Sequence, residues 1–132
     1  MNAKLIVLAA AATMGLAAQN VGAKITAVVP FAFDAKGVNL GSGTYEVTQS
    51  DRQAYVTLRN VETGKSIVLM GGAKSTNRTK DNSLEFKRYN DVYFLTAVAY
   101  ESAGLKIRLQ NTKREKEMAI AITPEVIVAR AW

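Results

Sequence analysis

The sequence predicts a small all-β domain, a sandwich or barrel of about 7–9 short antiparallel strands with one short helix near residues 112–121. Three observations predict this class. Apolar and polar side chains alternate along several short segments, which is the pattern of half-buried strands. Clusters of Gly, Asn, Asp and Ser recur between these segments, as in all-β domains. The chain contains no Cys, so its fold must be stable through packing without disulfides.

The first 23 residues have the pattern of a signal peptide. Lys4 gives a basic start, residues 5–18 form an uncharged apolar run, and small residues lead up to Ala23. The run is shorter than the roughly 20 residues that a membrane span needs. We expect cleavage after Ala23, with cleavage after Ala17 as the alternative; an uncleaved anchor or a buried apolar helix is the competing interpretation. Residues 24–132 then form one domain.

The first predicted strand covers residues 24–33, where alternate apolar side chains share one face over the whole segment. Pro30 lies inside this strand and has no N–H to donate. We therefore expect residues 24–33 to lie at a sheet edge or to carry a bulge at Pro30.

Three further strands are predicted in the first half of the domain, over residues 44–48, 54–60 and 66–70. Gly64 lies in the loop between the last two and suits a positive φ. Residues 66–70 (SIVLM) form a continuous apolar run, which predicts burial on both faces of the sheet.

The second half of the domain begins with a predicted hairpin, residues 84–89 and 91–100, turning at Asn90. A strand over residues 105–110 follows, and the last strand covers residues 125–131. Between them, Thr112 and Glu115 have the spacing of a capping box before a run of good helix formers. This run predicts the short helix.

The composition excludes most enzyme chemistry, because the chain has neither Cys nor His. It therefore lacks a Ser-His-Asp or Cys-His nucleophile system, an imidazole metal ligand and a Cys-ligated zinc or iron–sulfur site. Asp34, Asp51 and Asp91 lie at predicted turns, where Asp accepts hydrogen bonds from backbone amides. We expect a protein without enzymatic activity, catalytic residues, a cofactor or a metal.

The net charge of the chain is +6. It falls to +5 after loss of residues 1–23, the predicted leader, because Lys4 is the only charged side chain in that segment. Basic residues cluster in two segments, 74–80 and 113–116, but Asp81 and Glu115 interrupt them. Together with export, this pattern argues against a nucleic-acid surface. It favours a solvated face, or contact with anionic glycans and the cell envelope.

Both ends of the predicted mature chain are apolar and prone to form strands. One interpretation is that each strand completes the sheet of its own domain. The other is strand addition between subunits, the principle of donor-strand complementation, which propagates into a homo-oligomer or filament. The candidate assembly residues are Ile25, Ala27, Val29, Phe31, Phe33, Val126, Val128 and Trp132. This predicts a structural subunit of an extracellular filament.

The alternative function is a periplasmic or cell-surface binding module for a glycan or a lipid. It would use a row of tyrosines on one sheet face together with the basic loop at residues 71–82. The candidate tyrosines are Tyr45, Tyr55, Tyr89, Tyr93 and Tyr100.

Two segments carry a resemblance to a known group of proteins. Residues 29–33 (VPFAF) and 41–47 (GSGTYEV) resemble the "PFxF…LPAGTYxV" opening of small secreted proteins abundant in Acidobacteria. Residues 84–95 (LEFKRYNDVYFL) are similar to the "LxFxRYGDxYFL" hairpin of that group, and residues 113–117 to its late charged "SxxEre" segment. Gly41-Ser42 replaces Pro-Ala, and Asn90 replaces a Gly whose positive φ Asn tolerates. The resemblance implies an exported, single-domain bacterial protein and supplies no catalytic residues.

Overall fold

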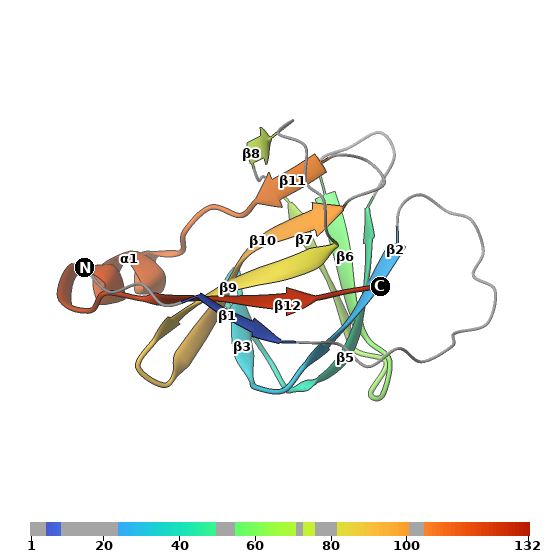
Figure 1. Ribbon diagram of the computed structural model, residues 1–132, viewed down its shortest axis with the longest axis horizontal. Helices are drawn as coiled ribbons and strands as arrows, with labels where there is room; N and C mark the ends of the chain where they lie inside the picture. Colours follow the sequence, from blue (N-terminus) through green and yellow to red (C-terminus); the bar gives the residue numbers. More distant parts are fainter. Residues whose placement is uncertain (1–4, 9–23, 50–54, 71–72, 76–81, 101–104) are drawn as a thin grey trace.

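The structure, a computed structural model, describes residues 5–8, 24–49, 55–70, 73–75, 82–100 and 105–132. The described residues form an all-β fold of two sheets with one helix, as predicted. The four-stranded sheet has the order β2 (Lys24–Val29), β5 (Gly43–Gln49), β6 (Tyr55–Asn60) and β7 (Ser66–Met70). The arrangement is a sandwich and not a closed barrel (Figure 1).

The eight-stranded sheet forms the other layer. Its main path runs β1 (Leu5–Leu8), β12 (Glu125–Arg130), β9 (Ser83–Tyr89), β10 (Val92–Tyr100), β11 (Leu105–Arg108) and β8 (Ala73–Ser75), while β3 (Phe33–Ala35) pairs with β10 and with β4 (Val38–Leu40). The described residues thus contain more strands than the 7–9 predicted, because strands of three or four residues give little sequence signal. The pairs β1–β12 and β3–β10 are parallel, where an antiparallel fold was predicted.

Pro30 divides the segment that the sequence predicts as one strand. Alternating burial along β2 is as expected, with its inward side chains at most 3% exposed. β2 ends at Val29, Pro30 is exposed, and the chain passes to β3 in the other sheet. β2 is an edge strand of the four-stranded sheet, in agreement with the expectation from Pro30.

Burial of residues 66–70 on both faces is a wrong prediction. Their strand, β7, is the edge of the four-stranded sheet, and the side chain of Val68 is 54% exposed on its outer face. Leu69 points inward and is buried. A continuous apolar run therefore marks an edge strand here, since hydrophobicity alone does not distinguish the two positions.

The predicted hairpin at Asn90 is present, with φ 57° at that residue. Its second strand departs from simple alternation, because the register of β10 against β9 shifts between Leu95 and Ala97. The extra residue, Thr96, donates its hydroxyl to the carbonyl of Glu85 at 3.2 Å. The bulge changes which side chains face the core, with Leu95 in the core before it and Val98 and Tyr100 after it.

The core lies between the sheets and is closed by aromatic rings. Phe33 packs edge-on against Tyr45 and Phe86, with ring centroids 5.3 and 5.2 Å apart. Phe31 contacts Phe86 in the same way and stacks on Tyr93 at 3.9 Å. Phe33 lies in the core and Phe31 packs against it, although β3, which contains Phe33, belongs to the other sheet from β2.

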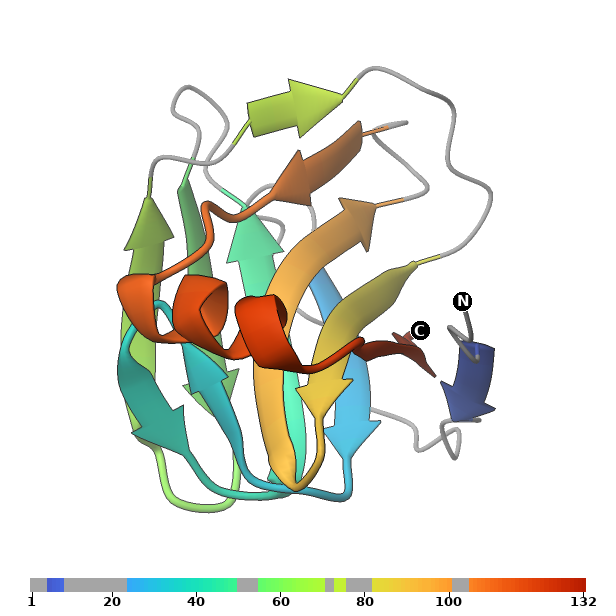
Figure 2. The same ribbon diagram turned by 90° about the vertical axis from the view of Figure 1, so that its left-hand side faces the viewer.

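The helix α1 (Lys113–Ala121) lies across the outside of β9 and β10 (Figure 2). Thr112 is its N-cap, and its hydroxyl accepts a hydrogen bond from the Glu115 amide at 3.2 Å, as the capping-box spacing predicts. Glu115 is the only buried residue of the helix, and Ile120 is 87% exposed. The helix is therefore not held by an apolar face.

Candidate functional site

The predicted assembly residues occupy two different environments. Ile25, Ala27, Val29 and Phe33 are at most 3% exposed and fill the core of their own domain, with Phe31 packed against them. The other three residues, Val126, Val128 and Trp132, are only half-buried. In one copy of the chain, β2 thus completes its own sheet by pairing with β5. Exchange of β2 between copies stays a prediction.

The two ends of the predicted mature domain meet in the structure. Ala27 in β2 and Ala131, just after β12, form an antiparallel bridge. Thr26 and Trp132 exchange two backbone hydrogen bonds, N–H to carbonyl, at 2.8 and 2.9 Å. Figure 1 shows the C-terminus beside β2 accordingly. This contact joins the two sheets at one corner of the sandwich.

The backbone of β12 has one edge in the sheet and one edge facing outward. The amide of Ala131 donates to the carbonyl of Asn82, on the side of β9, whereas Trp132 bonds to Thr26 on the opposite side. Successive residues of a strand direct their backbone groups to opposite edges. The backbone groups of Val126, Val128 and Arg130 therefore face outward, on the same side as those of Trp132.

The outward edge of β12 is completed by β1 (Figure 1). The two strands are parallel, and their register pairs Leu5 with Val126 and Leu8 with Ala129. β1 lies inside the apolar run that the sequence predicts to be a signal-peptide core. The sequence pattern does not predict this strand, although LIVL is β-prone, because an uncharged apolar run after a basic start is typical of a leader. The edge of β12 thus depends on a segment expected to be removed.

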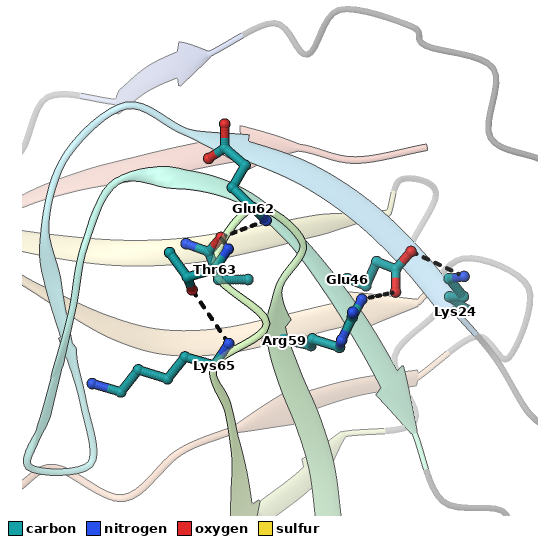
Figure 3. A network of polar contacts seen from close by, with 7 residues as sticks. Lys24, Glu46, Arg59, Glu62, Thr63 and Lys65 are labelled. Carbon is teal, nitrogen blue, oxygen red and sulfur yellow. Dashed lines mark hydrogen bonds and ion pairs between the residues drawn. The ribbon is translucent and has the colours of Figure 1, made fainter.

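A second group of polar contacts lies on the outer face of the four-stranded sheet (Figure 3). Glu46 accepts from Lys24 Nζ at 3.2 Å and from Arg59 Nη1 at 3.4 Å, across three neighbouring strands. Nearby, the Asn60 side-chain oxygen accepts from the Glu62 and Thr63 amides at 2.8 and 3.1 Å and closes the β6–β7 turn. These ion pairs are solvent-exposed and each contributes at most about 1 kcal/mol. We interpret them as a solvated face.

A buried polar cluster fastens α1 to the sheet. The Tyr89 hydroxyl donates to Glu115 Oε2 at 3.0 Å, and both residues are at most 3% exposed. Burial, and next the hydrogen bond to Glu115, raise the pKa of Tyr89 above its usual value near 10. Arg114 lies 5.8 Å above the ring of Phe94, and its Nη1 is 4.0 Å from Asp34 Oδ2. The two segments 84–95 and 113–117, which carry part of the family resemblance, thus contact each other through Tyr89 and Glu115. This contact stabilises the fold.

The described tyrosines do not form an exposed row. Tyr45, Tyr89 and Tyr100 are at most 1% exposed, and Tyr93 is stacked against Phe31. The Tyr55 side chain and most of the basic loop at residues 71–82 lie outside what the structure describes. Tyr45, Tyr89 and Tyr100 are therefore core residues and not part of an exposed row, and the glycan- or lipid-binding module stays a prediction.

Among the clefts on the described surface, two have volumes of about 190 Å³ each. This is below the roughly 300–1,000 Å³ of typical small-molecule sites. One cleft is lined by Leu40, Gly41, Ser42, Tyr45, Asn60, Thr63 and Lys65, and the other by Ala32, Phe33, Asp34, Asn39, Asp91, Val92, Tyr93 and Arg114. Among the described residues, no three Asp or Glu side chains are grouped so that they could hold a metal ion.

In the part of the chain that the structure covers, no helix has the length and hydrophobicity needed to cross a membrane. Comparison of the chain with protein-family models, with curated proteins and with solved structures finds no match.

Proposed function

We propose that this protein is an exported structural module without enzymatic activity, located outside the cell, in the periplasm or on the bacterial surface. It assembles into a homo-oligomer or filament by β-strand addition at the outward edge of β12. The proposal depends on one observation above all. The strand that completes this edge, β1, comes from the predicted leader. Removal of residues 1–23 would leave β12 as an edge strand with unpaired backbone groups.

The chemistry of this edge supports strand addition. β12 is apolar over Val126–Ala129. The side chains of Val126 and Val128 lie on the face of the strand away from the core, and they are half-buried in the presence of β1. An apolar edge strand without Pro or an inward-pointing charge can pair with another chain. Main-chain hydrogen bonds then provide affinity, and the side chains provide register. The absence of Cys and His from the whole sequence supports a role without catalysis.

The mature chain, exported and verified by mass spectrometry of its N-terminus, tests this function. Its size is measured by light scattering after gel filtration and its form by electron microscopy. We expect concentration-dependent oligomers or fibres. The variant Val128→Pro removes an outward-facing amide and places a ring at the edge, so it should remain monomeric. Because the amides of Ala129 and Ile127 face β9 and are retained, this variant should stay folded.

Val128→Thr is the matched control, because it keeps the backbone donor and a β-branched side chain. It should assemble like the unmodified mature chain. Circular dichroism and the unfolding midpoint show whether each variant is folded. A mature chain that stays monomeric at millimolar concentration contradicts the proposed function. Equal assembly by the folded Pro variant would place the interface elsewhere.

A further inference from the structure

The pairing of β1 with β12 has features of a removable cap. Four consecutive register pairs, from Leu5–Val126 to Leu8–Ala129, cover the stretch of the edge that β2 leaves open. β2 occupies the same edge only farther along, at Ala131 and Trp132. Between them, β1 and β2 leave little room for a strand from another copy. The occupant of the edge is thus a segment of the chain itself.

We propose that residues Leu5–Leu8 cap β12 in the uncleaved chain and keep it monomeric, so that removal of the leader permits assembly. The freed edge is then available to pair with an apolar strand of a second copy of the mature chain. This inference rests on the proposed function for the identity of that partner. The pairing of the cap itself can be tested independently.

The connection between the two strands explains why the cap is held before cleavage and lost after it. Residues 9–23 link β1 to β2, so the cap is present at an effective concentration of the order of millimolar. A strand with only four paired residues, in the less stable parallel arrangement, binds weakly without that link. Cleavage anywhere in residues 9–23, including after Ala17 or Ala23, removes the advantage. The domain then retains the same edge without its occupant.

Competition for the edge follows from the backbone geometry. The outward N–H and carbonyl groups of Val126 and Val128 can pair with one strand at a time. A cap in place therefore excludes an incoming strand from these positions. An incoming strand that pairs with them need not disturb β9, which bonds to the alternate residues Ile127 and Ala129. Cap exchange is thus compatible with an unchanged sandwich.

The test compares the full chain, made without processing and kept in detergent, with the mature chain in the same detergent. A third protein is the full chain with Ile6→Pro and Val7→Pro. Two consecutive prolines are needed because adjacent amides face opposite edges, so one of them must face β12. The matched control is the full chain with Ile6→Thr and Val7→Thr, which keeps both amides and β-branched side chains. Amide hydrogen exchange at Val126 and Val128 and the oligomeric state are measured for all four.

We expect the full chain and its Thr variant to be monomeric, with exchange at Val126 and Val128 slowed roughly tenfold or more relative to the Pro variant at low concentration. The Pro variant should assemble like the mature chain. A free peptide of residues 4–9 at micromolar concentration should leave assembly of the mature chain unchanged, because the link is missing.

Two results would overturn the inference. The first is equal exchange at Val126 and Val128 in the full chain and its Pro variant, which would show that β1 does not cover the edge. The second is assembly of the full chain to the same extent as the mature chain. Failure of the mature chain to assemble would instead contradict the proposed function, and the exchange comparison would still show whether the cap is paired.

Discussion

Removing one hydroxyl group, by Tyr89→Phe, should detach α1 from the sheet. This hydroxyl donates to Glu115 at 3.0 Å, and Glu115 is the only buried residue of the helix. A hydrogen bond to a charged group contributes about 1.5–3 kcal/mol, and a buried carboxylate left without a donor costs a similar amount. Undocking of the helix limits the loss, because Glu115 then reaches water. We expect a decrease of about 2 kcal/mol in the free energy of unfolding.

The assay is urea unfolding, followed by tryptophan fluorescence and circular dichroism, together with hydrogen exchange of the helix amides. For a domain of this size, 2 kcal/mol lowers the melting temperature by about 10 °C. The amides of Lys116 and Ile122, which bond to Thr112 and Met118, should exchange faster than those of β9 and β10. Adding Glu115→Gln to the Phe variant should recover part of the loss, since a neutral amide costs less to bury than a carboxylate.

Tyr100→Phe is the matched control for this experiment. Tyr100 is fully buried, and its hydroxyl has no hydrogen-bond partner among the residues that the structure describes. Removing an unpaired buried hydroxyl should leave stability unchanged or raise it by about 1 kcal/mol. If Tyr89→Phe were no more destabilising than Tyr100→Phe, the Tyr89–Glu115 contact would not hold the helix, and the reasoning would be refuted.

Two further predictions concern alkaline pH and Gly43, the first residue of β5. Burial raises the pKa of both Tyr89 and Tyr100 above the unfolded value near 10, so their contribution to stability is complete below pH 10 and is lost as pH rises above it. The free energy of unfolding, measured by urea titration between pH 8 and 11, should fall more steeply above pH 10 for the unmodified protein than for a Tyr89→Phe, Tyr100→Phe double variant. The difference in slope should be up to about 1.4 kcal/mol per pH unit for each tyrosine. Parallel curves for the two proteins would argue against this. Gly43→Ala should destabilise by about 1–2 kcal/mol, since φ is 153° and a Cβ would lie 2.6 Å from Glu62 Oε1 and 2.8 Å from Asn60 Nδ2. Gly41→Ala, with nothing within 4 Å of its Cβ, should leave the melting temperature unchanged, and thermal melts of both variants make the comparison. Equal melting temperatures for the two variants would show that the side chains near Gly43 move aside to make room for the added Cβ.

Local patterns predict the elements whose signal lies within a few residues. Alternation predicted the inward face of β2, the turn residues predicted the hairpins at Gly64 and Asn90, and the spacing of Thr112 and Glu115 predicted the start of α1. Each of these features arises from backbone sterics or from contacts between neighbours in sequence. The same reasoning did not identify the bulge at Thr96, because a bulge is set by the partner strand.

The candidate site was predictable only in part. The sequence indicates that the two ends of the domain are apolar and prone to pairing, and both ends do meet at Ala27 and Ala131. It does not indicate that Ile25 and Val29 are committed to the core while Val126 and Val128 remain near an edge. It also predicts the capping role of Thr112 but not the hydrogen bond between Tyr89 and the Glu115 side chain, since those two residues are distant in sequence.

Composition and periodicity are enough to establish an all-β domain, to exclude Cys and His chemistry, and to indicate a removable leader. These properties depend on residue types and on their order along the chain. The partner of each strand is a different matter, because β-pairing joins segments far apart in sequence and any apolar strand offers the same backbone groups. Strand pairing within the eight-stranded sheet places Leu5–Leu8 beside Val126–Ala129. The edge at which we propose assembly therefore becomes visible only in the folded chain.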